Sequence, residues 1–399
     1  MRDYLERLRA TGGLVEPGVL AVAVLVLTAI GFFRVALLPE FGRDLSMSTF
    51  QLGAVTTVFA VGRLAADLPG GHLADRFPAR GILAVSAGTV AVASLMFGLS
   101  VTLLPLYAAA LMVGMASATT NGTGMTYFSN VGGTDSRGTS MAIFSAALLG
   151  GQAFGPAAAG LMAAAWDWRV AMFIAAAAAA ALSLWLAFST GGGRSTIGPK
   201  ASAEDDRSGA TGPRLGSMLV LQSVSFAMFL TLGAVPNTLV PIVGSDVLGL
   251  GAAAIGLALG LGGLSRFIGT LVGGRMSDRM SRKSALVPGL LVQAAGVSLL
   301  AFPPSLVLWL SAIVVMSVAS FAVPVAATIV GDLSDPSRVG SQLGRFRFVG
   351  DLGLVAGPVT VGAIYDGVGR EAAFLTVAGL LTVVALVALK LLPETGSVE

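Results

Sequence analysis

The amino-acid sequence predicts an all-α membrane protein with twelve transmembrane helices in two pseudo-symmetric six-helix bundles. Its 399 residues are 55% hydrophobic and 11% charged, whereas about a quarter of the residues in soluble domains are charged. Apolar runs of about 20 residues recur along the chain, and a helix of that length crosses the roughly 30 Å hydrocarbon core of a bilayer. Several motifs of the first half recur in the second, which indicates a duplicated unit.

The apolar runs define the expected spans and the domain boundaries. They fall near residues 17–38, 49–71, 79–98, 102–128, 139–163, 168–189, 214–241, 251–274, 283–302, 304–331, 343–366 and 371–392. Residues 190–213 are polar and rich in Gly, Ser and charge, so they cannot bury enough apolar surface to fold. We therefore expect one bundle in residues 1–189, a linker in residues 190–213 and a second bundle in residues 214–399.

The charged residues of the loops predict the orientation in the membrane. With a cytoplasmic N-terminus, most loop arginines and lysines lie on the cytoplasmic side, and only Arg43, Arg169 and Arg370 lie opposite. The positive-inside rule therefore places both termini and the linker in the cytoplasm. The preference for Arg over Lys and the many Ala and Gly residues suggest a GC-rich bacterial gene, and hence the inner membrane. The net charge is only +3 and lies in short loops, so no nucleic-acid partner is expected.

Four motifs recur between the halves at offsets of 201 to 203 residues. The matching pairs are Pro39-x2-Gly42-x-Asp44 with Pro241-x2-Gly244-x-Asp246; Arg63, Gly71, Asp75 and Arg76 with Arg266, Gly274, Asp278 and Arg279; Gly151-x3-Gly155-Pro156-x3-Gly160 with Gly353-x3-Gly357-Pro358-x3-Gly362; and Arg169-x3-Phe173 with Arg370-x3-Phe374. An even number of spans separates the copies, so the halves are expected to be parallel repeats.

The loop after the second expected span carries the most specific motif. It reads Gly71-x3-Asp75-Arg76-x-Pro78-Ala79-Arg80, and its second copy reads Gly274-x3-Asp278-Arg279-x-Ser281-Arg282-Lys283. This pattern resembles the loop signature of the major facilitator superfamily, and the resemblance covers nearly the whole chain through its spans, linker and duplication. The chain resembles the 12-helix drug–proton antiporter branch of that superfamily. The Gly-Arg pair usual after the first Arg is Pro78-Ala79 here, so the loop backbone is expected to differ.

By this resemblance the two loops form a cytoplasmic gate. Its expected residues are Gly71, Asp75, Arg76, Arg80, Gly274, Asp278, Arg279 and Lys283. An Asp satisfies the unpaired N–H groups at the start of a helix. The resemblance places Asp75 at the start of the eleventh span and Asp278 at the start of the fifth, where they would latch the halves together in the outward-facing state. The alternative is a pair of tight loops whose arginines only set the topology.

The repeated Gly-Pro runs suggest bends and close helix packing in the fifth and eleventh spans. Small residues allow two helices to approach, and a proline inside a helix bends it. The expected bends lie at Gly155, Pro156, Gly357 and Pro358. Similar sequences in the fifth span mark proton-coupled antiporters of the superfamily, which implies export. The alternative is ordinary packing of small residues.

Charged residues inside the expected spans are candidates for function, because a charge in the membrane is costly. Arg63 lies eight residues before Gly71, about 12 Å along the helix from the cytoplasmic end, and Arg266 occupies the matching place in the second half. Arg34 lies toward the outer end of the first span. An arginine stays charged and therefore binds an anion or a carboxylate.

Three carboxylates are candidates for carrying a proton through the transport cycle, namely Glu40, Asp67 and Asp351. A buried carboxylate can alternate between a charged and a neutral form, which an arginine cannot. Asp67 lies one turn from Arg63, and Asp351 lies one turn from Arg347, so each is placed to form an ion pair. The alternative role is static pairing that holds the helices together.

Uncharged polar residues complete the candidate substrate site. In the superfamily, spans one, four, seven and ten face the central cavity, so the resemblance favours Asn121 in the fourth span and Asn237 in the seventh. The fourth span lacks the arginine that many drug exporters carry there. That departure weakens the transfer of their proton relay to this chain.

These features predict a secondary active transporter. The sequence has no GxxxxGK[ST] motif for ATP, so gradients are expected to drive transport. The expected activity is proton-coupled export of an amphiphilic or drug-like small molecule by alternating access. The alternatives are a small-anion importer or exchanger that uses Arg63 and Arg266, and a lipid or lysolipid translocator. No catalytic residue, metal or cofactor is expected. The protein is expected to be a monomer and not an enzyme.

Overall fold

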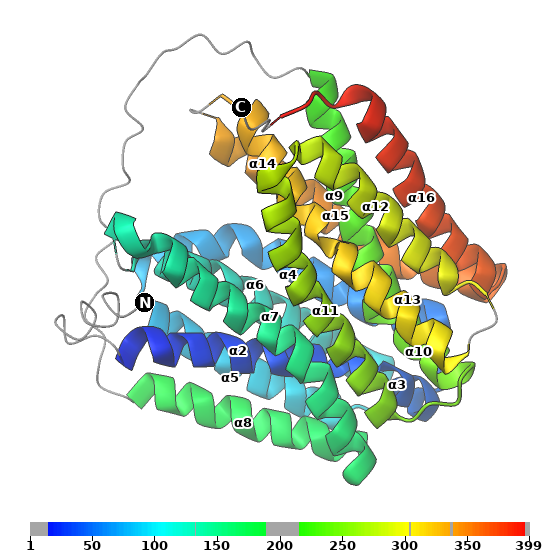
Figure 1. The fold of residues 1–399 in the computed structure, drawn as a ribbon. Helices are drawn as coiled ribbons and strands as arrows, with labels where there is room; N and C mark the ends of the chain where they lie inside the picture. Colours follow the sequence, from blue (N-terminus) through cyan, green and yellow to red (C-terminus); the bar gives the residue numbers. More distant parts are fainter. Residues whose placement is uncertain (1–14, 132, 189–214, 303–304, 336–337, 396–399) are drawn as a thin grey trace. The chain divides into compact units, whose positions relative to one another are not determined.

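The structure is a computed structural model that describes residues 15–131, 133–188, 215–302, 305–335 and 338–395. Within these ranges the regular elements are all helical, and short turns connect most of them (Figure 1). The linker predicted at residues 190–213 lies outside the described residues.

The helices follow the expected spans closely. They are α2 (Val15–Ala36), α3 (Leu38–Leu45), α4 (Thr49–Arg76), α5 (Ala79–Leu99), α6 (Leu103–Asn130), α7 (Gly133–Ala165), α8 (Trp168–Phe188), α9 (Leu215–Ala234), η1 (Val235–Leu239), α10 (Val240–Asp246), α11 (Ala252–Arg279), α12 (Arg282–Leu299), α13 (Leu306–Val318), η2 (Ala319–Phe321), α14 (Ala322–Leu333), α15 (Val339–Gly367) and α16 (Arg370–Leu391). The prediction of an all-α membrane protein is confirmed.

The number of spans differs from the prediction by one. In the described part of the chain, eleven helical stretches are long and apolar enough to cross a membrane, and α12 is not among them. This helix begins with Arg282 and Lys283 and contains Gln293, which lowers its mean hydropathy. It still packs against α13 and α16 in the position of the ninth span.

Three spans are interrupted rather than continuous. The first breaks at Leu37, between α2 and α3, and Pro39 lies in the first turn of α3. The seventh passes through the π-helix η1, which contains Pro236, before α10 begins. The tenth passes through the 3-10 helix η2. Proline lacks the N–H of a regular helical turn, so the backbone changes its hydrogen-bonding pattern near Pro39 and Pro236.

The chain forms two compact units. Unit 1 contains residues 1–40, 58–200 and 251–260, and unit 2 contains residues 41–57, 201–250 and 261–399. Each unit therefore includes a short segment from the other half of the sequence. In unit 1, α2 packs against α7, and α5 packs against α6 and α8; in unit 2, α9 packs against α15, and α12 packs against α16.

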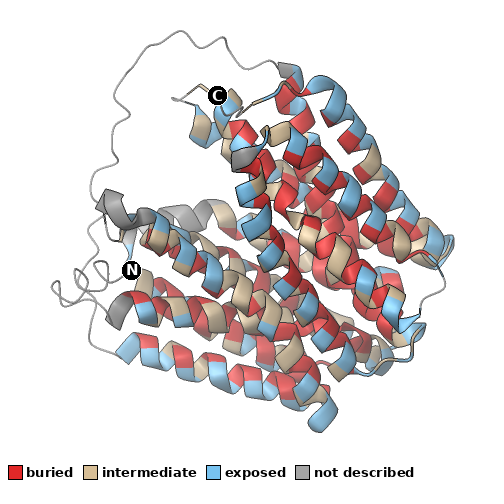
Figure 2. Cartoon of the chain, viewed as in Figure 1, coloured by how far each residue is buried: buried red, intermediate tan, exposed pale blue. Residues whose placement is uncertain are grey.

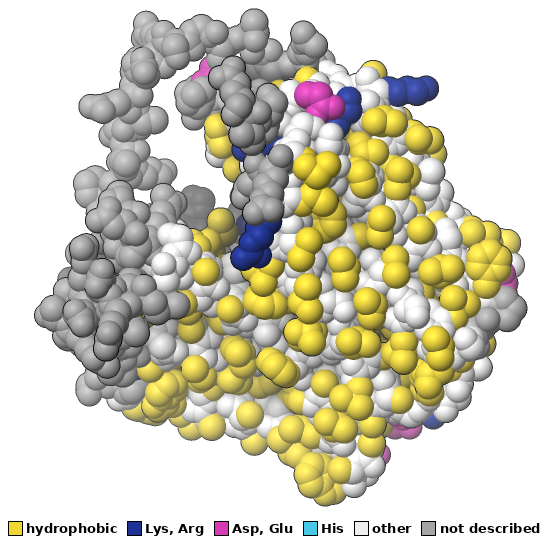
Figure 3. Space-filling view, in the orientation of Figure 1, with side chains coloured by type: hydrophobic (Ala, Val, Ile, Leu, Met, Phe, Trp, Pro, Cys, Tyr) yellow, Lys and Arg dark blue, Asp and Glu magenta, His cyan; other side chains and the backbone are white. Residues whose placement is uncertain are grey.

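The outward-facing sides of the helices carry many apolar residues, as do the sides that pack against neighbouring helices. Buried residues line the sides on which neighbouring helices meet within each unit (Figure 2). Large apolar side chains also face outward, with Val85 72%, Leu104 78% and Phe188 79% exposed. Hydrophobic side chains are spread over the described surface in Figure 3, and charged ones are few there. Such a surface is unfavourable in water and suits contact with lipid tails.

Candidate functional site

The repeated Gly-Pro runs lie at close contacts between helices. In unit 1, a Cβ at Gly155 on α7 would come within 2.3 Å of the Ala29 carbonyl oxygen on α2. In unit 2, a Cβ at Gly357 on α15 would come within 2.6 Å of the Leu230 carbonyl oxygen on α9. Both helices continue through their prolines, at Pro156 and Pro358. The absence of a side chain at the two glycines therefore sets the spacing of these helix pairs.

The prolines of the same runs form a second pair of close contacts. In unit 1, a Cβ at Gly256 on α11 would come within 2.3 Å of the Pro156 carbonyl oxygen. In unit 2, a Cβ at Gly53 on α4 would come within 2.4 Å of the Pro358 carbonyl oxygen. Gly256 lies 203 residues after Gly53, so the duplication repeats this contact. It fixes the short segments that each unit takes from the other half of the sequence.

Arg34 is a buried cation in unit 1. It lies in the last turn of α2 and is 1% exposed. Its guanidinium carbon lies 3.8 Å from the centre of the Phe59 ring on α4. No described residue accepts a hydrogen bond from its Nε, Nη1 or Nη2 atoms. Arg63, one turn after Phe59, is close enough for its positive charge to repel that of Arg34.

The observed contacts do not offset the cost of burying Arg34. Removing an ion from water costs several kcal/mol, even after the protein relaxes. A cation–π contact in a desolvated site contributes about 2 kcal/mol, and the Arg63 charge opposes it. Arg34 therefore remains a buried positive charge with hydrogen-bond donors to offer. A carboxylate or phosphate would satisfy both its charge and its donors.

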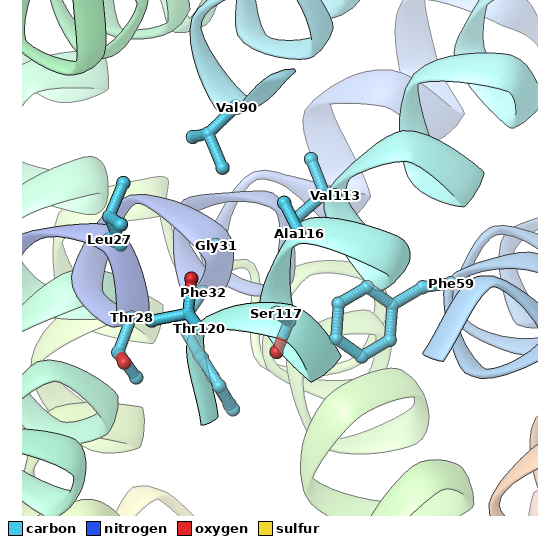
Figure 4. A pocket seen from close by; sticks show the side chains of 10 residues that line it. All are labelled: Leu27, Thr28, Gly31, Phe32, Phe59, Val90, Val113, Ala116, Ser117 and Thr120. Atoms are coloured by element: carbon cyan, nitrogen blue, oxygen red, sulfur yellow. The ribbon is translucent and has the colours of Figure 1, made fainter. Parts of the chain in front are cut away.

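A small pocket, with room for about one water-sized molecule, shares Phe59 with this arginine, which does not line it. It lies between α2, α4, α5 and α6 (Figure 4), and its lining residues are Leu27, Thr28, Gly31, Phe32, Phe59, Val90, Val113, Ala116, Ser117 and Thr120. The lining is apolar except for three hydroxyl groups. Phe59 belongs to both features, because its ring lines the pocket and lies under the Arg34 guanidinium.

The pocket shows which residues the sequence reasoning missed. Asn121 is half-buried on α6 and does not line the pocket, whereas its neighbour Thr120 does. The hydroxyl oxygen of Thr120 is buried and has no hydrogen-bond partner among the described residues. Thr28 and Ser117 were not foreseen. On α6 the lining positions follow a spacing of three or four residues, which is one face of a helix, and that spacing is readable in the sequence.

Asn237 lies in unit 2, within the π-helix η1, and is 7% exposed. Its carbonyl oxygen accepts a hydrogen bond of 3.3 Å from the Thr56 hydroxyl. The Thr238 hydroxyl lies 2.9 Å from the Gly233 carbonyl oxygen and 3.2 Å from the Thr56 hydroxyl. A π-helix often marks a functional position, and here it is hydrogen-bonded to the N-terminal part of α4.

The remaining charged candidates are distributed over both units. In unit 1, Glu40 and Asp67 are half-buried, and no ion pair joins Asp67 to Arg63 among the described side chains. In unit 2, Asp351 is 3% exposed on α15. Arg266 belongs to unit 2 and Arg63 to unit 1.

The expected gate lies only partly within the described residues. The side chains of residues 68–76 and 278–279 are outside them, so Gly71, Asp75, Arg76, Asp278 and Arg279 stay predictions. Gly274 has no atom within 4 Å of a Cβ added to it, and Arg80 is half-buried. Two residues of the second loop form ion pairs. Lys283 Nζ lies 3.9 Å from a Glu394 carboxylate oxygen, and Arg282 pairs with Asp332 on α14.

The chain is similar in sequence to known proteins over most of its length. The sequence pattern of the Major Facilitator Superfamily matches residues 19–265 and 219–399. A chloramphenicol resistance protein of Streptomyces lividans is 26% identical over 385 residues, which cover 92% of this chain and 93% of that protein. The class C tetracycline resistance protein of Escherichia coli is 26% identical over 357 residues, which cover 87% and 89% of the two chains.

Solved structures of other proteins have a fold similar to that of this chain. A bacterial homologue of the human lysosomal transporter Spinster, inward-facing and occupied, has a TM-score of 0.74 and 14% identity, covering 94% of this chain and 95% of its own. A D-xylose–proton symporter has a TM-score of 0.74 and 17% identity, covering 95% and 97%. At these identities the likeness concerns the fold alone.

Proposed function

Because the chain belongs to the Major Facilitator Superfamily of transporters, we propose that it exports small amphiphilic or drug-like compounds in exchange for protons. The observation that carries the proposal is the similarity of the chain, over 92% and 87% of its length, to two bacterial resistance proteins. The relatives named for resistance to chloramphenicol and tetracycline support the same substrate class.

The carboxylates supply the proposed coupling. Asp351 is the most buried of the three candidates, at 3% exposure, and it lies on α15, which packs against the interrupted seventh span. Protonation would remove a charge that is costly to bury, and so would change which packing of these helices is favoured. Glu40 and Asp67 are the further candidates. With both termini in the cytoplasm of a bacterium, the inner-membrane proton gradient would drive substrate outward.

Vesicle transport tests this proposal. Purified protein reconstituted in proteoliposomes is given chloramphenicol or tetracycline, with and without an imposed proton gradient. We expect accumulation on the acidic side, and we expect a protonophore to abolish it. Accumulation that is unaffected by collapse of the gradient would contradict proton exchange, and a lack of transport of both compounds would contradict the substrate class.

Small anions are the second candidate, because Arg63 and Arg266 place cations at matching positions of the apolar helices α4 and α11. The same vesicles distinguish the two functions when nitrate or phosphate replaces the drug. Replacement of Arg63 or Arg266 with Gln would then reduce anion uptake while leaving chloramphenicol transport in place.

A further inference from the structure

The first turn of α4 is held by a side chain from the other half of the sequence. Asp366, near the end of α15, accepts a hydrogen bond of 3.2 Å from the Thr49 N–H and one of 2.8 Å from the Phe50 N–H, each on a different carboxylate oxygen. Both segments belong to unit 2. We propose that this contact, the Asp366 clamp, holds α4 against α15 in one transport state and is released in the other. The proposal rests on the proposed transport function and names a residue that controls its conformational step.

The clamp completes the hydrogen bonding at the start of α4. The first N–H groups of a helix have no partner inside that helix. The Gln51 N–H donates to the Ser48 hydroxyl at 3.3 Å, and the Ser48 N–H donates to the Gln51 side chain at 3.0 Å, which is a capping box. The two N–H groups between these residues are the ones that Asp366 accepts.

The two parts of this cap respond differently when α4 moves. Ser48 and Gln51 lie in the same short segment as the groups they satisfy, so they move with the helix. Asp366 is 316 residues away from Phe50 in the sequence, so separation of α4 from α15 breaks its bonds. A carboxylate at a helix N-terminus is stabilising, but Asp366 is exposed, so water replaces the lost bonds at a modest cost. The clamp is therefore strong enough to bias the helices and weak enough to open in every cycle.

Below the clamp, α4 and α15 pack closely. An added Cβ at Gly362 would come within 2.8 Å of the Thr49 carbonyl oxygen. The Thr57 hydroxyl donates a hydrogen bond of 2.7 Å to the Val355 carbonyl oxygen. Residues 49–57 of α4 lie in unit 2, and the rest of the helix lies in unit 1. Because one helix belongs to both units, a movement between them has to bend α4 or break its contact with α15.

The carboxylate occurs in one half only. With the offset of 202 residues, the counterpart of Asp366 is Ala164. The helix packing itself is repeated, since a Cβ at Gly160 on α7 would come within 2.2 Å of the Ala252 carbonyl oxygen at the start of α11. Close packing at this level therefore belongs to the duplicated fold, and the clamp is an addition at α4 and α15.

The predicted orientation places the clamp on the outer side of the membrane. The positive-inside rule puts Arg43 and Arg370 opposite the termini. Arg43 comes six residues before Thr49, and Arg370 comes four residues after Asp366. An intact clamp thus opposes opening to the outside, and its release accompanies that opening.

Labelling of a single cysteine tests the clamp without any substrate. The chain contains no cysteine, so Thr57→Cys places one thiol on the side of α4 that faces α15. Cells that express this protein are treated with a membrane-impermeant maleimide, and the labelled fraction is measured after purification. In this background Asp366→Asn removes the charge and one acceptor oxygen of the clamp. We expect the labelling rate to rise about fivefold, because the loss of a charge-assisted cap shifts the equilibrium toward the outward-open form.

Three more variants separate a clamp from a general weakening. Glu371→Gln removes an exposed carboxylate that is bonded to Arg370 instead of α4, and we expect it to leave the rate unchanged. Ser48→Ala removes the local part of the cap, which is present in both states, so we expect a lower melting temperature and an unchanged rate. Thr49→Pro removes one donor of the clamp at a position where helices accept proline, and we expect a faster rate, as for Asp366→Asn.

Each outcome bears on the clamp. An Asp366→Asn rate equal to that of the Thr57→Cys protein alone would overturn it, and so would an equal increase in Glu371→Gln or Ser48→Ala. If Asp366→Asn does not fold, Thr49→Pro decides the question, and an unchanged rate in that variant would overturn the clamp. A failure of drug transport in vesicles would refute the proposed function, whereas the labelling rates report the conformation of the protein by themselves.

Discussion

The packing of α2 against α7 gives a sharp prediction for Gly155. Its added Cβ would lie 2.3 Å from the Ala29 carbonyl oxygen, whereas real Cβ atoms stay beyond about 3.0 Å from such a neighbour. In Gly155→Ala the two helices must therefore separate by about 0.7 Å, because the obstacle is backbone and cannot rotate away. Overpacking of this kind costs about 1–3 kcal/mol. The expected result is a lower melting temperature for the purified protein, measured by thermal unfolding in detergent.

Gly150 on the same helix is the matched control. Its added Cβ would meet the Leu25 side chain at 3.6 Å and the Phe154 ring at 3.9 Å, which are ordinary van der Waals contacts. Alanine also has a better helix propensity than glycine by up to about 1 kcal/mol. Gly150→Ala should therefore be neutral or stabilising. Equal melting temperatures for Gly155→Ala and Gly150→Ala would refute the packing argument.

Three further substitutions test other contacts. Thr56→Val removes the hydroxyl that bonds the Asn237 carbonyl, and is expected to lower stability by about 1 kcal/mol in thermal unfolding; an unchanged melting temperature would show that this hydrogen bond contributes nothing. Arg282→Gln removes a partly exposed ion pair with Asp332, and should cost at most about 1 kcal/mol, with a smaller effect in high salt. Asp351→Asn cannot change its charge, so vesicles are expected to lose the proton dependence of transport; full gradient-driven accumulation would rule out Asp351 as the carrier.

Most of the fold was predictable because its signals are local. A run of about 20 apolar residues specifies a membrane helix without knowledge of its neighbours. The breaks near Pro39 and Pro236 follow from the missing N–H of proline. The ninth span is the exception, since Arg282, Lys283 and Gln293 lower the hydropathy of α12 below that of the other spans.

The candidate site was less predictable because it depends on which helix faces meet. Arg34 was identified from its charge alone, since a charge in an apolar run is conspicuous. The stacking of Arg34 on Phe59 and the lining by Thr28 and Ser117 depend on contacts between α2, α4 and α6. In a membrane helix both the packed and the lipid-facing sides are apolar, so the hydrophobic pattern does not separate them. The exchange of residues 41–57 and 251–260 between the units is likewise a property of packing rather than of either segment's composition.

The central claim is that the substrate contacts the residues that line the small pocket of unit 1 while a proton gradient drives its export. The most direct measurement is gradient-driven tetracycline accumulation by vesicles containing Ser117→Phe, which fills the pocket, compared with Val85→Phe at a position that is 72% exposed. The account predicts that Ser117→Phe loses accumulation and that Val85→Phe keeps the wild-type rate. Wild-type accumulation by a folded Ser117→Phe protein would contradict it.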